Sequence, residues 1–316
     1  MLLRCRTIIL LALTLTLPAW AERDPIRLTH GPMLGHVTSN SVRVWARTSD
    51  EGAFAVNYGP APSDLSFKTA GETDLSSDNT GSVMLSKLQP DTHYHYQIEV
   101  NGRPHGLPGS FRTLPSSEET RHPEHNPEGL FNFRFEVGSC ANQNPLHGIG
   151  HSLPTYTNLN RDWADKVHFH IMNGDWLYEE LREYPPEAWR LLQGIEKLPR
   201  TVDVMPTIVG VWENYKLYLS RGVELAKWHR NVPSYFTFDD HELVNDIWGA
   251  GTEGKRHRRT VFRDIGTRAW YDYLGWANPV EHNERVHFGR AKMTEGSALL
   301  VDRTIGRGIC QRMRLR

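Results

Sequence analysis

The fold of this 316-residue chain is decided by residues 169–178, FHIMNGDWLY, in which an apolar run ends abruptly in a polar cluster. Residues 133–142, FRFEVGSCAN, and residues 235–242, YFTFDDHE, repeat that arrangement. Short apolar runs bounded by turn residues are typical of buried strands. Because ligand sites in α/β sheets gather at the carboxyl ends of strands, we expect the three polar clusters to lie side by side.

Helical stretches separate these strand candidates. Apolar and aromatic residues recur at helical spacing over residues 208–228 and again over 261–274, and a fourth strand is expected over residues 298–301. Strands that alternate with helices indicate βαβ units. Residues 131–316 are therefore predicted to form an α/β domain.

Residues 26–114 have a different pattern. Apolar and polar residues alternate over 41–47 and 93–100, which predicts half-buried strands, and clusters of Gly, Pro, Asn and Asp separate such runs. The turn at residues 88–94, LQPDTHY, resembles the corner of fibronectin-type sandwiches, which are ~100 residues long. We expect a fibronectin type III-like all-β sandwich, followed by a Pro-containing linker over residues 115–130.

Residues 1–21 are predicted to be a signal peptide. Arg4 and Arg6 precede an apolar run over residues 8–17, and Ala19-Trp20-Ala21 fits a small-x-small cleavage site. The apolar run is shorter than the ~20 residues that a membrane-spanning helix needs. Cleavage after Ala21 would leave a periplasmic or extracellular protein with no stable membrane anchor. The net charge of −1 argues against a nucleic-acid partner.

The polar clusters have the composition of a metal site. Carboxylate and phenolate oxygens suit hard, highly charged cations, and a cysteine thiolate can hold iron. Gly174 allows a sharp turn ahead of Asp175, and Tyr178 could then reach the same ion. Trp176, inside this motif, is expected to line the site. Each residue alone has a simpler interpretation, with Cys140 as a small buried hydrophobe, Asp175 as a turn residue and Tyr178 as part of the core.

Taken together, Ser139-Cys140, residues 174–179 (GDWLYE) and residues 239–242 (DDHE) resemble the signature of the alkaline phosphatase D family, the PhoD-like metallophosphatases. The resemblance extends over about residues 27–303 and includes the fibronectin-type region. It implies a metallophosphatase-like αββα sandwich in the α/β part. It also implies a binuclear Fe(III)–Ca(II) centre that hydrolyses phosphate monoesters and diesters of small molecules.

The resemblance also assigns roles to individual residues. Cys140 and Tyr178 would ligate iron, and Asp175 would bridge the two ions. Other metallophosphatases have Gly-Asn-His-Glu at residues 239–242, so Asp240 takes the place of the Asn ligand. His241 then faces the substrate as a charge stabiliser or a general acid. Supporting or secondary ligand roles fall to the other candidates: Asn142, Asp239, Glu242 and Asn245.

The chain departs from the family in one respect. Metallophosphatases draw further ligands from a Gly-Asp-x-His or Gly-His-x-His segment in the second half of the domain, and the histidines after His241 stand in no such segment: His257, His282 and His287. We therefore expect a truncated chain with a partial phosphatase domain and an incomplete site. Two alternatives to a secreted phosphoesterase stay open. One is an inactive remnant that exposes an apolar sheet face, and the other is a binding or adhesion protein led by the sandwich. No protein partner is predicted.

Overall fold

The computed structural model describes residues 25–145, 150–178, 208–243, 245, 258–279, 291–293 and 300–302. The predicted signal peptide and the late histidines at positions 257, 282 and 287 lie outside the described residues. None of the described helices is both long and apolar enough to cross a bilayer.

The N-terminal region is an all-β sandwich, as predicted. Burial alternates along β6 (His93–Val100), whose even-numbered side chains point into the core. One sheet has the strand order β4-β3-β6-β7, and it packs against the layer formed by β5, β2 and β1. The other elements of this region are β1 (Leu28–Gly35), β2 (Ser41–Thr48), β3 (Gly52–Gly59), β4 (Phe67–Thr73), η1 (Leu75–Ser77), β5 (Thr80–Ser86) and β7 (Arg103–Arg112).

The second layer of the sandwich continues into the α/β region as a single sheet. Its order is β5-β2-β1-β10-β9-β8, and β1 runs parallel to β10 with Gly35 opposite Ser234. The added strands are β8 (Phe135–Gly138), β9 (Phe169–Asn173) and β10 (Ser234–Thr237), all parallel to their neighbours. Gly35 is required at the junction, because a Cβ there would lie 2.4 Å from the Cβ of Ala277. The sandwich is therefore joined to the α/β region by strand pairing as well as by the connecting chain.

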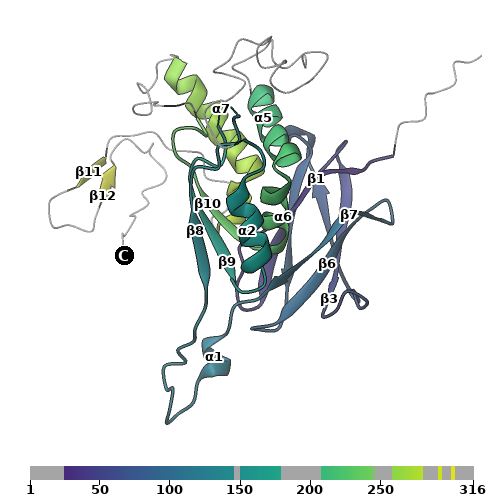
Figure 1. Cartoon of the computed structure of the whole chain (residues 1–316), viewed down its shortest axis with the longest axis vertical. Coiled ribbons are helices and arrows are strands. Elements are labelled where there is room, and N and C mark those ends of the chain that lie inside the picture. Colours follow the sequence, from purple (N-terminus) through teal and green to yellow (C-terminus); the bar gives the residue numbers. More distant parts are fainter. Residues whose placement is uncertain are drawn as a thin grey trace, which may run out of the picture.

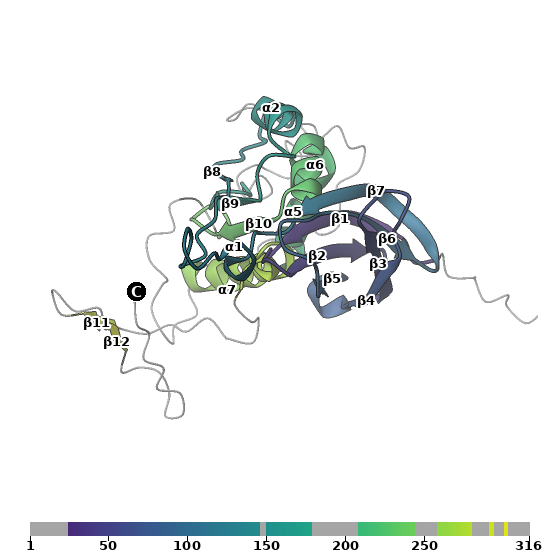
Figure 2. The same cartoon turned by 90° about the horizontal axis from the view of Figure 1, so that it is seen from below.

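Helices cover one face of this continuous sheet (Figures 1 and 2). Helix α6 crosses β1 and packs on α2 and α5, while α7 packs on α5. The predicted helix over residues 208–228 is divided at Gly222 into two. The bounds are α2 (Pro154–Asp162), α5 (Ile208–Arg221), α6 (Val223–Asn231), α7 (Arg258–Tyr273) and η3 (Gly275–Ala277). Residues 298–301 were expected to form a strand; β12 (Leu300–Asp302) pairs with β11 (Ala291–Met293) in a separate two-stranded sheet.

Two apolar cores result, one on each face of β1 and β2. The alternation in β2 is as predicted, with Val42, Val44 and Ala46 in the core of the sandwich. Trp45 points the other way, into the core beneath the helices, where it stacks on Trp276 with ring centroids 6.3 Å apart. Both faces of this strand are buried because the sandwich covers one and the helices cover the other.

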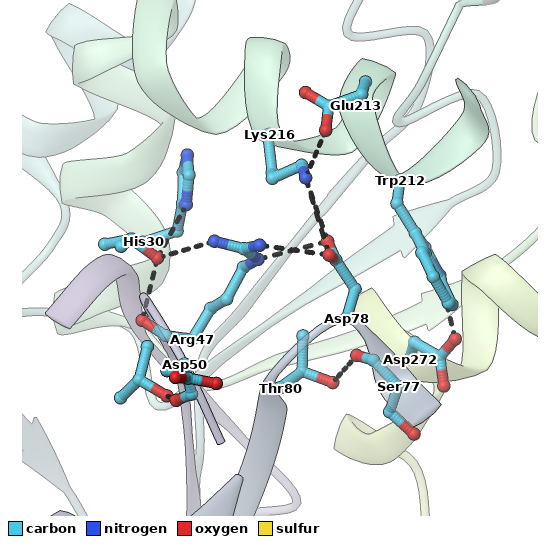
Figure 3. A network of polar contacts seen from close by, with 12 residues as sticks. His30, Arg47, Asp50, Ser77, Asp78, Thr80, Trp212, Glu213, Lys216 and Asp272 are labelled. Atoms are coloured by element: carbon cyan, nitrogen blue, oxygen red, sulfur yellow. Dashed lines mark hydrogen bonds and ion pairs between the residues drawn. The ribbon is translucent and has the colours of Figure 1, made fainter. Parts of the chain in front are cut away.

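A buried network of charged groups also fastens the sandwich to the helices (Figure 3). Asp78, in the turn before β5, accepts two hydrogen bonds from Arg47 of β2, at 3.0 and 3.1 Å. Lys216 of α5 lies 3.3 Å from the same carboxylate, and the Tyr273 hydroxyl of α7 donates to it. Burial alone would raise the pKa of Asp78, but the hydrogen bonds from Arg47 and Tyr273 hold it below its ordinary value.

The segment predicted as a linker carries local structure of its own. Helix α1 (Ser117–Thr120) projects from the body in Figure 1, and a single bridge joins His122 to Asn126. The Asn126 side chain donates 2.9 Å hydrogen bonds to the carbonyls of Thr120 and Leu130. These contacts close the segment into a small, self-bonded projection.

The chain that leads into β8, and β8 itself, expose apolar side chains. Phe133, Phe135 and Val137 are 47%, 48% and 55% exposed, and Phe135 stacks on Phe169 of β9 with ring centroids 5.4 Å apart. This row and His170 of β9 lie on opposite faces of the sheet. His170 is buried and faces the core beneath the helices. An apolar stripe is therefore left in contact with solvent.

Candidate metal centre

The three polar clusters meet at one edge of the sheet. Strands β8, β9 and β10 are parallel neighbours, with Gly138 opposite Met172 and Asn173 opposite Thr237. Their carboxyl ends therefore lie at the same edge, where α/β proteins commonly bind ligands. Cys140 follows β8, Asp175 follows β9, and residues 239–242 follow β10.

The backbone turns sharply at two of these positions. Cys140 and Asp175 are both left-handed, with φ of 60° and 56°, and this conformation costs a non-glycine residue about 1–2 kcal/mol. Gly174 has φ of 80°, and a Cβ there would lie 2.7 Å from the Cβ of Asp239. The Ala141 amide donates to the Asp175 carbonyl at 2.8 Å, so the two turns support each other. Strained backbone of this kind clusters at functional sites.

The Asp175 carboxylate is the centre of the arrangement. Its Oδ2 accepts from Cys140 Sγ and from the Tyr178 hydroxyl, each at 3.4 Å. Its Oδ1 is buried and has no hydrogen-bond partner among the described residues. Ligand atoms of Asp175, Asp240 and His241 lie within 4.8 Å of one another. A buried carboxylate oxygen with a free lone pair, among other ligand-type groups, suits a cation.

The electrostatics of the cluster support the same interpretation. Burial raises the pKa of Asp175, and the carboxylates of Asp240 and Asp239 add to that rise, although Cys140 and His241 oppose it. Burial also raises the pKa of Tyr178, as do its contacts with Cys140 and Asp175. A bound cation would reverse both shifts, because it stabilises the carboxylate and the phenolate.

His241 stacks on Tyr178, with ring centroids 3.9 Å apart at an angle of 32°. It reaches this position because residues 239–243 form a tight turn, in which the Leu243 amide donates to the Asp240 carbonyl at 2.8 Å. The imidazole thereby lies beside the Asp175 carboxylate and half exposed, where a substrate could meet it.

Glu242 is fully buried beneath the cluster and binds backbone. Its Oε1 accepts from the Trp176 amide at 2.6 Å and its Oε2 from the amides of Asp175 and Asp239, at 3.1 and 2.9 Å. Burial raises the pKa of Glu242 to about 7, although these amides favour its ionised form. This one side chain ties the turn after β9 to the turn after β10.

The remaining candidates are Asp239, Asn142 and Asn245. Asp239 Oδ1 accepts from the Asp240 amide at 3.0 Å. Asn142 Oδ1 accepts from the Asn144 amide at 2.8 Å and so closes a local turn. Asn245 is an exposed turn residue. The structure thus gathers Cys140, Asp175, Tyr178, Asp240 and His241, with Glu242 behind them; their metal and catalytic roles stay predictions.

The expectation that Trp176 lines the site is wrong. Its side chain is fully buried and packs against Tyr215 and Tyr218 of α5. Its indole nitrogen donates to His229 Nε2 at 3.0 Å. His229 was not among the predicted site residues, although it follows the buried Leu225 at the i+4 spacing that marks the apolar face of α6.

Comparisons with known proteins agree with this architecture. Residues 135–297, more than half of the chain, match the family model described as PhoD-like phosphatase. Residues 26–117 match a separate model, described as a domain of unknown function. The fibronectin type III assignment of the sandwich therefore stays a prediction. No curated protein matches the chain.

Among solved structures, a structure of PhoD is similar over 87% of this chain, with a TM-score of 0.60 and 18% sequence identity. At that identity the likeness shows the fold alone. The chain spans about half of the PhoD chain, 51% of its length. The fn3 domain of human contactin 1 has a TM-score of 0.24 and 16% identity, over 32% of this chain and 89% of that one; so low a score supports no argument.

Proposed function

The chain belongs to the PhoD-like phosphatase family, and from that premise we propose that it is a secreted, metal-dependent phosphoesterase acting on small phosphate esters. Family membership supports hydrolysis of phosphoesters in general. The binuclear centre, the identity of its metals and the monoester and diester substrates are part of the proposal. So is the periplasmic or extracellular location, which rests on the signal-peptide pattern of residues 1–21.

The observation that carries the proposal is the unsatisfied oxygen of Asp175. A buried carboxylate oxygen without a hydrogen-bond donor is costly, because the carboxylate has lost its water and gained no partner in return. The Cys140 thiol and the Tyr178 phenol contact the other oxygen of the same carboxylate, and ligand atoms of Asp240 and His241 lie within 4.8 Å of Asp175. This donor set fits a hard trivalent or divalent cation, and the thiol and phenol favour iron.

When bound, such ions supply charge neutralisation for the phosphate and activation of a water molecule. Asp175, Cys140 and Tyr178 would hold the iron, and Asp175 and Asp240 would face the second ion, for which calcium is proposed. His241 would hydrogen-bond the phosphate or give a proton to the leaving oxygen. Glu242 would keep the two turns in register by holding their amides.

The test is reconstitution of the purified chain with Fe(III) and Ca(II). We expect hydrolysis of p-nitrophenyl phosphate or bis-p-nitrophenyl phosphate at alkaline pH, and a visible tyrosinate–iron absorption band. D175N should abolish both, and because Asn tolerates a left-handed turn, it should still fold. Y178F should remove the band.

Y235F is the matched control for Y178F. Tyr235 is also partly buried, but its hydroxyl donates to the Val37 carbonyl at 2.8 Å, on the sandwich side of the sheet. The band and the activity should survive that change. Failure of the wild-type chain to bind metal, or hydrolysis no faster than with metal in buffer, would exclude the proposed activity in favour of a non-catalytic role.

A further inference from the structure

A chain of buried hydrogen bonds runs behind the metal-binding turn. The indole of Trp176 donates to Nε2 of His229 at 3.0 Å, and Nδ1 of His229 lies 2.8 Å from the Ser234 hydroxyl. That hydroxyl lies 3.1 Å from the Val232 carbonyl. Trp176, His229 and Ser234 are all fully buried. The chain joins the residue next to Asp175 to helix α6 and to the start of β10.

The direction of these bonds follows from their chemistry. An indole nitrogen can only donate, so Nε2 of His229 must carry a lone pair. Burial, and the nearby His170, lower the pKa of His229 well below its ordinary value, so the ring is neutral and its proton sits on Nδ1. Nδ1 therefore donates to Ser234, whose own proton goes to the Val232 carbonyl. The side-chain polar atoms of Trp176, His229 and Ser234 therefore all have hydrogen-bond partners.

The indole nitrogen is the single polar atom of the Trp176 side chain, and the rest of the ring makes aromatic contacts. It stacks on Tyr215 with ring centroids 5.7 Å apart, and it lies 6.0 Å from the ring of Tyr218. Such contacts bury the ring, but they offer no acceptor in line with the indole N–H. His229 supplies that acceptor and so gives the ring a directional anchor.

The position of the ring matters because Asp175 precedes it directly. Asp175 is held in a left-handed conformation that the free chain would leave. Glu242 restrains the amides on both sides of that residue, and the Trp176 side chain anchors the segment from below. A shift of the indole would rotate the peptide after Asp175 and turn its carboxylate away from Cys140.

We propose that His229 is a positioning residue of the metal centre: through the Trp176 indole it holds Asp175 in its left-handed turn. The consequence of this role for metal binding rests on the proposed function. The role itself is a property of the metal-free protein and is tested there.

The test is amide hydrogen exchange in the metal-free chain, with Fe(III) binding as a second readout. H229L removes the acceptor and should speed exchange at the amides of Asp175 and Trp176 by about tenfold or more, as expected for a buried donor left without a partner. H229Q offers Oε1 to the indole and should restore protection to within about threefold. Should H229L fail to fold, W176F removes the donor, keeps an aromatic ring, and should show the same local acceleration.

H168L is the matched control. His168 is another buried histidine, but it accepts the Arg134 amide at the opposite end of β9, 3.1 Å away. It should leave exchange at Asp175 and Trp176 unchanged. Equal protection of those amides in H229L and wild type overturns the proposal. Equally faster amide exchange throughout the protein, including β6, also overturns it, because that would indicate a purely structural role.

Fe(III) titration separates this proposal from the proposed function. The affinity of the chain for Fe(III), followed by the tyrosinate band, should fall about tenfold in H229L and recover in H229Q. If the wild-type chain binds no Fe(III) while H229L still speeds amide exchange at Asp175 and Trp176, the proposed function is contradicted and the positioning role is supported.

Discussion

Replacing Asp78 by alanine is the most direct test of how the sandwich and the α/β region are joined. Asp78 lies between the two: it pairs with Arg47 of the sandwich and with Lys216 of α5 (Figure 3), and it accepts a hydrogen bond from the Tyr273 hydroxyl of α7. The side chains of Asp78, Arg47 and Lys216 are only 13%, 11% and 14% exposed. D78A would leave Arg47 without its carboxylate partner and with little access to water, whereas Lys216 would keep its ion pair with Glu213 at 2.5 Å.

The expected loss is large. Removing one partner of a buried ion pair costs about 3–5 kcal/mol, because the remaining charge stays buried without compensation. Asp78 also has φ of 57°, where alanine is less favourable than aspartate by about 1 kcal/mol. We therefore expect D78A to lower the free energy of unfolding by about 4–6 kcal/mol, a large part of the 5–15 kcal/mol typical of a domain. D78N keeps the turn and one acceptor, and should cost about 2 kcal/mol.

The assay is urea unfolding, followed by tryptophan fluorescence for the core beneath the helices and by far-UV circular dichroism for both regions. Trp45 and Trp276 report on the junction, because their rings stack there. The two probes should change together in a single transition, since one sheet runs through both regions. The effect of D78A should shrink in acid: the pKa of Asp78 is held below its ordinary value, so its stabilisation is present at neutral pH and is lost as the pH falls through that lowered pKa.

D162A is the matched control. Asp162 pairs with Arg161 at 2.6 Å, but these side chains are 45% and 65% exposed, and solvent screens such pairs so that they contribute little to stability. The reasoning fails if D78A and D162A are equally mild. It also fails if D78A splits the unfolding into two transitions and displaces only one of them.

Three further predictions concern other parts of the chain. G174A should lower Fe(III) affinity at least tenfold and destabilise the fold by about 2 kcal/mol, because the added Cβ would lie 2.7 Å from the Cβ of Asp239. Its control is G102A, at a position with φ of 72° and open space around it: this change should destabilise the fold by about 1 kcal/mol and leave Fe(III) binding intact. Burial raises the pKa of Asp272 to about 6, so protonation of Asp272 favours the folded state and the protein loses stability as pH rises from ~4 to ~6. D272N should remove this loss in urea unfolding measured at several pH values, and an unchanged pH profile in D272N would contradict the prediction. F135S should reduce binding of a hydrophobic dye and slow aggregation, because Phe135 is 48% exposed; unchanged dye binding would show that this stripe is not the site of dye binding.

The sandwich was largely predictable because its strands carry their own signal. In β6 every second residue is apolar, and these are the residues that the core buries. The continuous sheet was not predictable. Its junction depends on Gly35 pairing with Ser234, two residues that lie far apart in the chain and carry no local pattern. The polar face of β2 is likewise misleading, because Trp45 and Arg47 are buried only once the helices cover them.

The candidate site divides in the same way. Cys140, Asp175 and the run that starts at Asp239 stand directly after apolar strands, so their convergence follows from parallel pairing of β8, β9 and β10. Trp176 was misplaced because its neighbours in sequence are site residues, whereas its direction is set by α5 and α6. Local sequence reveals which backbone passes the site, and tertiary packing decides which side chains enter it.

The support for the strained turns comes from Glu242 and His229, which are not among the proposed metal ligands. Two left-handed residues, Cys140 and Asp175, cost about 2–4 kcal/mol together. Glu242 offsets this cost by accepting backbone amides on both sides of Asp175, at about 1 kcal/mol for each bond, and His229 adds one more bond through Trp176. The hydrogen bonds thus roughly balance the cost of the two left-handed residues. The turn should stay formed without metal, yet the loss of a single supporting hydrogen bond should disturb it. A site built in this way would be preorganised for a cation, and residues well outside its ligand set would govern its affinity.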